Sequence, residues 1–590
     1  MTEFMCGIFG IVSKDNSSAS SVFRGLLDIE YRGYDSWGVA YLEDGGFKIE
    51  KQVGFLPKDK KFPGAEVAIG HTRWATHGGV TELNAHPHAS CDGKIVMVHN
   101  GIVENYLELK KEISSHKIVS ETDTEVVVHL IEDEVKRYEI RDTRYDLKKA
   151  VSEVFKKVKG LNAFVVTDGK TIVAVKRGSP IVAGDSDKGA IIASDPNAIL
   201  PHTKKLLFLE DNDLVEINPD GLKLYDALSL EEQDAKFTEV DWEYSDEKLD
   251  EYDYFLEKEI NEQPRVLLSI AKNTDEMEKV AEEVKKAYGT YLIACGSASY
   301  ACLLGVYLLS HIAKRHVNFS IGSEFNYIQD FIKERSLVIA VSQSGETIDV
   351  VEPVGNAKKK GARIISLVNV LGSTLYRMAD HPVLLNAGPE KAVCSTKALS
   401  AMFAHMVLLA YCLINKKEEG EKILLDSARE IESIIQRKDE IKKLAHQIVD
   451  QKHMFILGRG LSYPVALEAT LKIKENTYIH AEGFAGGELK HGVIALIAKG
   501  TPVIVFVPND ETREAMLANA MEVKARGAYV IGVGPENNPV FDYYFEVRDV
   551  GASSVIPHPV FAQFLSYYLA LELGNNPDKP RNLAKSVVVK

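Results

Sequence analysis

The sequence predicts a multidomain chain in which an N-terminal α+β domain is followed by two doubly wound α/β subdomains with parallel sheets. Three observations support this prediction. Short β-rich segments alternate with glycine turns as far as about residue 216. Beyond about residue 263, apolar runs alternate with longer helical stretches. Two parts of this second half also resemble each other. A length of 590 residues accommodates about three or four domains at the usual domain size.

The composition is that of an ordinary globular protein, with 45% apolar and 26% charged residues. The net charge of -15 disfavours a nucleic-acid partner, which requires a basic surface. The six cysteines show no paired framework, which suits a reducing compartment. No basic segment precedes an apolar one at the N-terminus, and the longest apolar run, 399–414, contains His405. We therefore expect a cytoplasmic protein without a membrane partner.

In the N-terminal domain, assigned to residues 6–225, the segments 94–98 and 163–166 are typical β-strands. Helices are expected near 103–116 and 122–138. The composition then becomes acidic and polar, which predicts a linker over 226–262.

The second half contains an internal repeat. Tyr291–Gly296 resembles Met454–Gly458, and Val338–Val341 resembles Val503–Phe506, at nearly the same spacing. Each apolar run leads into a similar polar turn. The repeat predicts tandem subdomains over 263–430 and 431–575, followed by a tail over 576–590.

Cys6 begins the apolar segment Cys6-Gly7-Ile8, which is the pattern of an N-terminal nucleophile. In such enzymes the thiol attacks a carbonyl while the free α-amine of the same residue acts as the base. Residues 1–5 precede Cys6, so translation starts at Met5, or the leader is removed, or the site is inactive. The alternative interpretation is a buried strand cysteine.

Other motifs of this domain fit an amino-acid substrate. The guanidinium of Arg73 suits a carboxylate, and Asp123 suits an ammonium group. The side-chain amide of Asn100 and the backbone N–H of Gly101 together suit an oxyanion, although Asn-Gly is also a common turn. A metal site is the other interpretation of this region, with Cys91 and five histidines as ligands; these are His71, His77, His86, His88 and His99. Because no Cys-x-x-Cys or His-Glu-x-x-His spacing occurs, we expect no metal.

A phosphate cradle is predicted where the apolar run 337–341 leads into Ser342-Gln343-Ser344-Gly345-Glu346-Thr347 and then a helix beginning near Ile348. Hydroxyls and backbone N–H groups at a helix start can surround a phosphate dianion. An ordinary helix cap is the alternative. Ser297 and the segment 395–397 could add polar groups.

A second candidate site lies on the predicted helix 464–476. Glu468, Lys472 and Glu475 share one of its faces, either as part of a site or as a solvated ion pair. The segment 480–491, which ends at His491, combines titratable groups with glycines and favours a site. The C-terminal segment 581–587, which includes Lys585, is partly apolar and is either part of that site or a docked end.

The N-terminal motifs, taken together and in order, resemble the class-II glutamine amidotransferase domain. They are Cys6-Gly7-Ile8, Arg73-Trp74-Ala75-Thr76-His77-Gly78, His99-Asn100-Gly101 and Glu121-Thr122-Asp123-Thr124-Glu125. The resemblance implies a four-layer αββα N-terminal-nucleophile fold that releases ammonia from glutamine. It also places Arg73, Trp74, Thr76, His77 and Asp123 at the glutamine site.

The whole chain from Cys6 to Lys590 resembles the glutamine–fructose-6-phosphate aminotransferase (isomerizing) family, also called glucosamine-6-phosphate synthases. This resemblance implies two sugar-isomerase (SIS) subdomains, no metal or organic cofactor, and a homodimer that binds glutamine and fructose 6-phosphate. It also implies roles for single residues. Ser342, Gln343, Ser344 and Thr347 bind the sugar phosphate, and Glu475 transfers a proton between carbons 1 and 2 with help from Lys472. His491 from a neighbouring subunit opens the sugar ring, Lys585 forms an imine, and Trp74 gates an ammonia tunnel. We add Ser297 to the phosphate site on its position after the preceding strand.

Two positions depart from the pattern of this family. Trp37 stands where the family usually has a small residue, and Ala298 stands where a serine commonly helps to bind phosphate. Two other functions stay open, namely an amidotransferase for another acceptor and a non-catalytic sugar-phosphate sensor. Glu475, His491 and Lys585 disfavour a sensor, which needs no proton-transfer groups.

Overall fold

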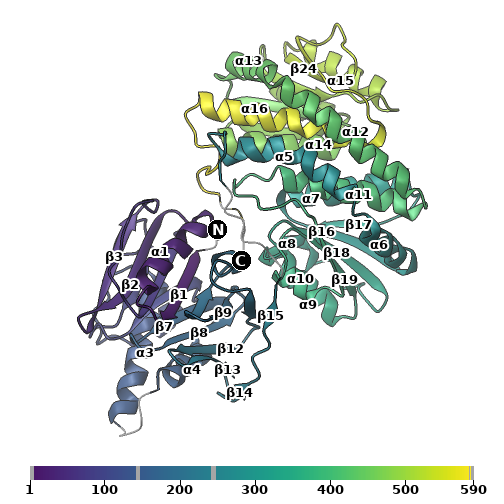
Figure 1. The fold of residues 1–590 in the computed structure, drawn as a ribbon. Coiled ribbons are helices and arrows are strands. Elements are labelled where there is room, and N and C mark those ends of the chain that lie inside the picture. Colours follow the sequence, from purple (N-terminus) through teal and green to yellow (C-terminus); the bar gives the residue numbers. More distant parts are fainter. Residues whose placement is uncertain (1–5, 141–145, 241–247, 584, 586–590) are drawn as a thin grey trace. The chain divides into compact units, whose positions relative to one another are not determined.

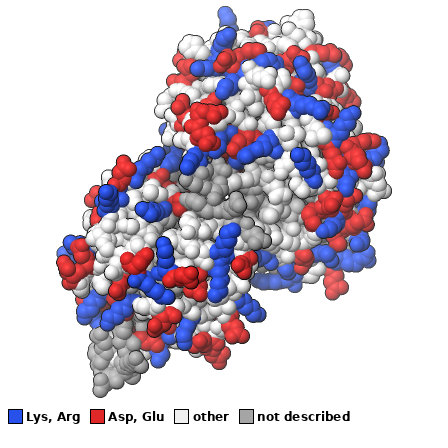
Figure 2. Space-filling view, viewed as in Figure 1, with Lys and Arg blue, Asp and Glu red and all other residues white. Residues whose placement is uncertain are grey.

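The computed structural model describes residues 6–140, 146–240, 248–583 and 585. The chain forms two compact units, residues 1–246 with 586–590 and residues 247–585 (Figure 1). On the face shown in Figure 2, basic and acidic side chains are interspersed over both units.

The N-terminal unit contains two antiparallel sheets. The eight-stranded sheet has the order β15-β11-β9-β10-β1-β4-β2-β3, and the seven-stranded sheet has the order β14-β13-β12-β8-β7-β6-β5. The strands of the first sheet are β1 (Gly7–Ser13), β2 (Ser36–Glu43), β3 (Gly46–Val53), β4 (Val67–Arg73), β9 (Val182–Ser186), β10 (Gly189–Ala193), β11 (Lys205–Phe208) and β15 (Thr238–Glu239). Those of the second are β5 (His88–Ala89), β6 (Val96–Gly101), β7 (Asn162–Thr167), β8 (Ile172–Arg177), β12 (Asp213–Asn218), β13 (Gly221–Asp226) and β14 (Glu232–Gln233).

Alternation of side chains along the strands produces four layers. Ile8 of β1 and Val98 of β6 belong to the apolar cluster between the two sheets, whereas Phe9 packs toward α1 and Met97 toward α3 and α4. The helices of this unit are α1 (Ser18–Asp28), α2 (Tyr106–Leu109), α3 (Asp123–Ile140) and α4 (Leu147–Lys157), with 3₁₀ turns η1 (Glu30–Arg32) and η2 (Pro196–Ala198). The predicted αββα arrangement is confirmed.

The segment predicted as a linker carries secondary structure. β14 extends the seven-stranded sheet and β15 extends the eight-stranded sheet, so residues up to 239 complete the N-terminal unit. The helix α5 (Phe255–Ile270) also begins before residue 262. The acidic composition reflects exposed edge strands in this part of the segment.

The second unit contains two parallel five-stranded sheets with the same strand order, β17-β16-β18-β19-β20 and β22-β21-β23-β24-β25. The first consists of β16 (Gly289–Ala294), β17 (Asn318–Ile321), β18 (Ser336–Ser342), β19 (Arg363–Val368) and β20 (His381–Leu384). The second consists of β21 (His453–Gly458), β22 (His480–Ala485), β23 (Pro502–Phe506), β24 (Tyr529–Gly534) and β25 (Tyr543–Glu546). The predicted duplication of β16 and β18 as β21 and β23 is confirmed.

Helices cover both sheets of this unit. They are α6 (Asp275–Lys286), α7 (Gly296–His311), α8 (Gly322–Phe325), α9 (Ile348–Lys359), α10 (Thr374–Met378), α11 (Lys397–Leu413), α12 (Lys417–Gln436), α13 (Lys438–Ile448), α14 (Ser462–Thr477), α15 (Arg513–Lys524) and α16 (His558–Glu572), with 3₁₀ turns η3 (Glu488–His491), η4 (Val493–Leu496) and η5 (Gly551–Val555). One apolar core runs through α7, α11, α14 and α16 (Figure 1). The boundary predicted at residue 430 falls inside α12.

The predicted apolar run at 399–414 is the core helix α11, whose side chains are almost all buried. Across the described residues, no helix combines the length and apolarity needed to cross a membrane.

The order of each parallel sheet fixes where a ligand can bind. The chain leaves β16 and β18 in opposite directions from the middle of the sheet, and ligands of such folds bind in the crevice at the carboxyl ends of these two strands. Here α7 begins at Gly296 directly after β16, and α9 begins at Ile348 shortly after β18. The two predicted phosphate-binding segments therefore lie at one edge of the sheet.

Candidate active sites

Cys6 lies at the start of β1, between β4 and β10 in the eight-stranded sheet. Its side chain is buried beside Trp74, whose backbone N–H donates a 3.3 Å hydrogen bond to Sγ. The neighbouring Gly7 is required by close packing, because a Cβ there would lie 2.4 Å from the hydroxyl oxygen of Thr72. This packing fixes the position of Cys6 at the start of β1.

Burial raises the pKa of the Cys6 thiol to about 11, although the Trp74 hydrogen bond and the charge of Arg73 act in the opposite direction. At neutral pH the thiol therefore keeps its proton. Nucleophilic attack needs a base to remove that proton, because the thiolate is the reactive form.

Asn100 and Gly101 end β6 in the facing sheet. Asn100 lies two residues after Val98 on β6, so its side chain points to the same face of the sheet, between the two sheets. There its Nδ2 donates a 2.8 Å hydrogen bond to the carbonyl oxygen of Cys6. Gly101 has a φ of +127°, and a Cβ there would lie 2.1 Å from the carbonyl oxygen of Leu161. The structure thus places Asn100 next to Cys6 and explains why glycine follows it.

The structure gives Arg73 and Asp123 local partners. The guanidinium of Arg73 donates to the carbonyl oxygens of His77 and Gly79, at 2.5 and 3.1 Å, and so fixes the loop after β4. Asp123 accepts a 2.7 Å hydrogen bond from the N–H of Val103. Of the other predicted glutamine-binding residues, Thr76 is exposed, His77 packs edge-on against Tyr106, and Trp74 packs edge-on against Tyr34.

Four of the five histidines considered as metal ligands have buried rings with hydrogen-bond partners. The rings of His71 and His86 lie 4.2 Å apart, and His71 Nε2 contacts the carbonyl oxygen of His99 at 3.0 Å. His99 contacts Thr124 and Asn162 through its two ring nitrogens, and His88 contacts Thr122. Burial lowers the pKa of each ring, that of His71 to about 3, so these histidines are neutral.

In the second unit, the predicted strand, polar loop and helix are confirmed by β18, residues 342–347 and α9. The hydroxyls of Ser342 and Thr347 lie 3.2 Å apart, and Ser342 Oγ accepts the N–H of Gly345 at 3.0 Å. Ser344 Oγ accepts the N–H of Glu346. Gly345 has a φ of +67°, and a Cβ there would lie 2.0 Å from Ser373 Oγ. The loop is tightly wound, with three hydroxyls at the carboxyl end of the strand. The backbone carbonyl of Gln343 accepts the N–H of Asn369.

The helix α14 carries two carboxylates that contact one buried lysine. Nζ of Lys472 lies 2.6 Å from Oε2 of Glu475 and 3.4 Å from Oε1 of Glu468. The side chains of Lys472 and Glu468 are 1% and 0% exposed, whereas that of Glu475 is 18% exposed. The interpretation of a solvated ion pair is therefore wrong. Ser297, at the start of α7, donates to Oε1 of Glu468 and so joins the two segments.

Burial also shapes the charges of this cluster. Desolvation raises the pKa of Glu468 to about 7, against the opposing charge of Lys472. Burial favours the neutral form of Lys472, but Glu468 and Glu475 outweigh this effect and raise the pKa of Lys472 above its ordinary value. Lys472 is thus a buried cation that orients Glu475, the one partly exposed side chain of the three.

Lys585 is anchored by a buried glutamate. Its Nζ donates to Oε2 of Glu390 at 2.6 Å and to the carbonyl oxygen of Ala392 at 2.7 Å. Glu390 also accepts the N–H groups of Thr396 and Ala398, which lie at the start of α11. The tail is therefore docked.

The Cys394 thiol links Lys585 to α14. It donates to Asn476 Oδ1 at 2.9 Å. Burial and then the charge of Glu475 raise its pKa, whereas Lys472 and Lys585 act in the opposite direction. The charges of three predicted sugar-site residues thus act on one thiol.

Comparison with known proteins identifies the family. A family model described as a glutamine amidotransferase domain matches residues 71–201, and one described as a SIS domain matches residues 283–411 and 447–540. The glutamine–fructose-6-phosphate aminotransferase (isomerizing) of Clostridium tetani is 40% identical over 99% of this chain and 100% of its own length, and that of Thermus thermophilus is 39% identical over the same shares. This chain belongs to the glutamine–fructose-6-phosphate aminotransferase family.

Solved structures agree with this family in the second unit. The C-terminal domain of glucosamine-fructose-6-phosphate aminotransferase from Francisella tularensis matches 56% of this chain and 100% of its own, with a TM-score of 0.53 and 30% identity. Tagatose-6-phosphate ketose/aldose isomerase from Escherichia coli matches 55% of this chain and 96% of its own, with a TM-score of 0.50 and 18% identity, and so shares the fold.

The structure of this aminotransferase brings most of the predicted site residues together but leaves some of them apart. Cys6 and Asn100 are in contact, and Lys472, Glu475, Ser297 and Lys585 gather around α14. His491 is exposed at the end of η3, and its role depends on a second subunit and stays a prediction. Residues 1–5, which include the leader, lie outside the described residues.

Sequence reasoning missed one buried residue, and the two positions that depart from the family pattern are both buried. Glu390 was missed, because a glutamate in a loop carries no local signal of burial and its partner Lys585 lies far along the chain. Trp37 is buried on the helix side of the eight-stranded sheet, where it packs edge-on against Phe23 of α1. Its bulk is thus accommodated away from the face that carries Cys6. Ala298 is buried in the first turn of α7, next to Ser297.

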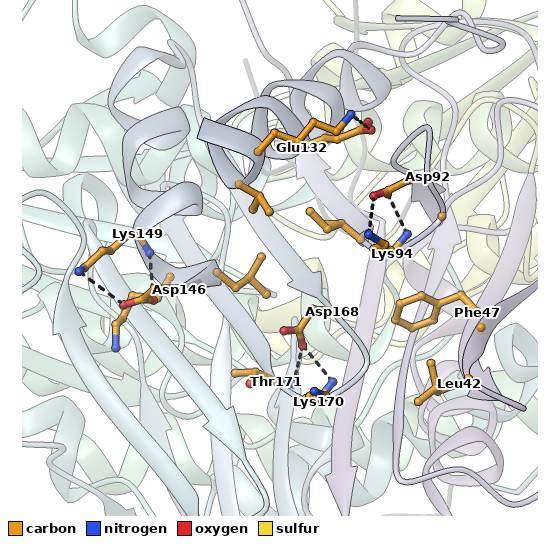
Figure 3. Close-up of a pocket in the computed structure, with 18 of the residues that line it drawn as sticks. Leu42, Phe47, Asp92, Lys94, Glu132, Asp146, Lys149, Asp168, Lys170 and Thr171 are labelled. Carbon is orange, nitrogen blue, oxygen red and sulfur yellow. Dashed lines mark hydrogen bonds and ion pairs between the residues drawn. The ribbon is translucent and has the colours of Figure 1, made fainter. Parts of the chain in front are cut away.

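The N-terminal unit also contains a pocket of about 950 Å³ that is separate from Cys6. Leu42, Phe47 and several acidic and basic side chains line it, and none of the predicted site residues does (Figure 3). Asp92 and Asp168 accept the N–H groups of Lys94 and Lys170, as the dashed lines in Figure 3 show. In the same lining, Lys136 pairs with Glu132 and Lys148 pairs with Glu216.

Proposed function

We propose that this aminotransferase moves the amide nitrogen of glutamine onto fructose 6-phosphate and converts the ketose to an aldose, giving glucosamine 6-phosphate and glutamate. The main support for the sugar half-reaction is the row of side chains Glu468, Lys472 and Glu475 on α14. In this row the buried cation of Lys472 holds the partly exposed carboxylate of Glu475. The membership in the family and the contact between Cys6 and Asn100 support the glutamine half-reaction.

In the first half-reaction, the Cys6 sulfur attacks the amide carbonyl of glutamine. The proton of the thiol passes to the α-amine of Cys6 and then to the departing ammonia, while Asn100 and Gly101 stabilise the oxyanion. Water then hydrolyses the thioester to glutamate. Because burial raises the pKa of the thiol to about 11, a base has to take its proton, and the α-amine of Cys6 can serve as that base where residues 1–5 are absent.

In the second half-reaction, ammonia condenses with the carbonyl at carbon 2 of the open-chain ketose with loss of water. The carboxylate of Glu475 takes a proton from carbon 1 and returns it to carbon 2, and the resulting amino aldose closes its ring. Ser342, Ser344, Thr347 and Ser297, together with Gln343, hold the phosphate near the first turns of α9 and α7. Lys472 holds the carboxylate of Glu475 in place through their 2.6 Å ion pair.

Lys585 and His491 complete the proposed sugar site. Lys585 passes a proton to Glu390, its 2.6 Å partner, and its free amine then condenses first with the carbonyl at carbon 2, which loses water. Ammonia replaces the lysine on this imine, so that one water is lost overall and the amine of Lys585 is released. His491 acts from a neighbouring subunit to open the sugar ring, which requires a homodimer. We further propose a cytoplasmic location, supported by the six free cysteines.

The test is to incubate the purified enzyme with fructose 6-phosphate and glutamine that carries ¹⁵N in its amide, and to detect labelled hexosamine phosphate by mass spectrometry. The Glu475→Gln variant should form no product while still hydrolysing glutamine. Glu514→Gln, a change of an exposed carboxylate on α15, is the matched control and should keep both activities. Equal loss of both activities in Glu475→Gln would refute the assignment of Glu475. If ammonium restores product formation where glutamine fails, the glutamine site is blocked and the sugar site stands.

A further inference from the structure

Four side chains with metal-binding atoms converge in the N-terminal unit, outside both proposed active sites. They are Cys91, in the hairpin between β5 and β6, His116, in the segment after α2, and His129 and Glu132, on one face of α3. One ligand atom of each residue lies within 4.8 Å of those of the other three. Among the described residues, this is the one group of cysteine, histidine and acidic side chains with such convergence.

The distances between these atoms fit a tetrahedral ion. Sγ of Cys91 lies 3.3 Å from Nδ1 of His116 and 3.7 Å from Nδ1 of His129. Oε2 of Glu132 lies 3.4 and 3.3 Å from the same two nitrogens. Metal–ligand bonds of about 2.0–2.3 Å at tetrahedral angles separate neighbouring ligand atoms by about 3.3–3.6 Å. Three of the four separations given above fall in this range, and the fourth, between Cys91 Sγ and His129 Nδ1, is slightly longer at 3.7 Å.

The outer nitrogens of both histidines face carboxylates. Nε2 of His116 lies 2.9 Å from Oδ1 of Asp133, and Nε2 of His129 lies 3.7 Å from Oε1 of Glu125. A proton on each Nε2 leaves each Nδ1 with its lone pair pointing into the cluster. The 2.9 Å contact orients His116 as carboxylates commonly orient histidines that bind metals. The 3.7 Å separation is too long for a hydrogen bond, so Glu125 acts on His129 through its charge alone.

With these tautomers, the cluster has too few hydrogen atoms to form hydrogen bonds among its inward-facing ligand atoms. Two imidazole nitrogens, one carboxylate oxygen and one sulfur point inward, and the Cys91 thiol supplies one hydrogen among them. The N–H of Cys91 also donates to Oε2 of Glu132 at 2.7 Å, and Lys136 pairs with the other oxygen, Oε1. A divalent cation would satisfy all four inward lone pairs. With one thiolate and one carboxylate as ligands, its charge would be balanced inside a largely buried site.

We propose that Cys91, His116, His129 and Glu132 bind one zinc ion. A thiolate with two imidazoles and a carboxylate suits zinc better than the harder magnesium or calcium ions. Binding releases the thiol proton of Cys91 to solvent and involves no redox step. Because four protein ligands leave no open position, the ion is structural.

The zinc ion ties the β5–β6 hairpin to α3. This hairpin carries Asn100 and Gly101 at its far end, and α3 begins at Asp123, so the ion braces two elements that carry predicted glutamine-site residues. The proposal does not depend on the reaction that the enzyme catalyses. Glu132 also lines the pocket of Figure 3, and Cys91 is exposed, so the ion can enter from solvent.

The test measures zinc in the full chain. The protein is loaded with zinc sulfate, dialysed against metal-free buffer and analysed by atomic emission. We expect about one zinc per chain in the wild type, and loss of this zinc in Cys91→Ser, an exposed position where serine should not prevent folding. Cys412→Ser, which changes a thiol on α11, should keep the metal.

Asp133→Asn provides a second variant that leaves all four ligands in place. Loss of the carboxylate that orients His116 should weaken zinc binding by about 10–100-fold. Glu134→Gln, at the next position of α3, is the control and should bind normally, since the carboxylate of Glu134 pairs with Arg137 instead. Cobalt substituted for zinc should show a thiolate charge-transfer absorption that Cys91→Ser lacks.

Three results would overturn the proposal. The first is a wild type that retains no more zinc than Cys91→Ser. The second is an equal loss of zinc in the control variants, which would indicate adventitious binding. The third is zinc affinity in Asp133→Asn equal to that of Glu134→Gln. If protonated histidines alone hold the cluster together, the wild type will retain no more zinc than Cys91→Ser.

Discussion

Replacing Lys472 by methionine removes the cation from the Glu468–Lys472–Glu475 row and keeps most of the side-chain volume. The side chains of Lys472 and Glu468 are 1% and 0% exposed, so Glu468 would be left as a buried carboxylate without its partner. Breaking a buried ion pair in this way costs about 3–5 kcal/mol. That cost corresponds to a rise of more than about 100-fold in the equilibrium constant for opening of α14. Lys474→Met is the matched control, because Lys474 is exposed on the same helix, and a surface change costs less than about 0.5 kcal/mol.

The expected pH dependence follows from Glu468. Its pKa is about 7 in the folded enzyme and 4.5 as an ordinary glutamate, so between these values the folded state binds more protons than the unfolded state. Stability from this group therefore falls as the pH rises from 4.5 to 7. Without Lys472 the folded pKa should rise further, which extends the loss above pH 7. Lys472→Met should thus be less destabilising at pH 6 than at pH 8, because a protonated Glu468 needs no cation.

Amide hydrogen exchange measured by mass spectrometry on peptides from α14 is the suitable assay. Both tryptophans among the described residues, Trp37 and Trp74, lie in the other unit, so the fluorescence of these two side chains should not change. The double variant Lys472→Met with Glu468→Gln should recover part of the protection, since it removes the buried charge. Exchange in Lys472→Met equal to that in Lys474→Met, or a double variant no more protected than the single one, would refute the reasoning.

Two further predictions concern the glutamine site. Gly101→Ala should abolish glutamine-dependent synthesis but keep ammonium-dependent synthesis, because its Cβ would collide with the carbonyl oxygen of Leu161, 2.1 Å away, and shift the loop beside Asn100. Steady-state assays with each nitrogen donor decide this, and equal loss with both donors would contradict it. Alkylation of the Cys6 peptide by iodoacetamide should accelerate about tenfold per pH unit from pH 7 to pH 9, since the raised pKa of about 11 keeps the thiolate scarce in this range. A rate that levels off below pH 8 would indicate a thiol of ordinary pKa.

Local patterns in the sequence predicted much of the fold. The apolar run 337–341 predicted β18 and the polar loop that leads into α9, and the internal repeat predicted two tandem subdomains, whose sheets share one strand order in the structure. These features depend on neighbours in the chain, which set strand parity, helix starts and turns. The acidic segment after residue 226 misled the same reasoning, because exposed edge strands such as β14 have the composition of a linker.

The sequence by itself determined which chemical groups this aminotransferase possesses and in which order, including Cys6, Asn100, Lys472 and Glu475. Only the tertiary structure decided their environments. It buried Glu468 and Lys472, paired Lys585 with Glu390 across 195 positions, and brought Cys91 to His116 and His129. The physical reason is that burial and the convergence of side chains depend on which elements pack together. Residues far apart in the chain leave no periodic signal of their contact.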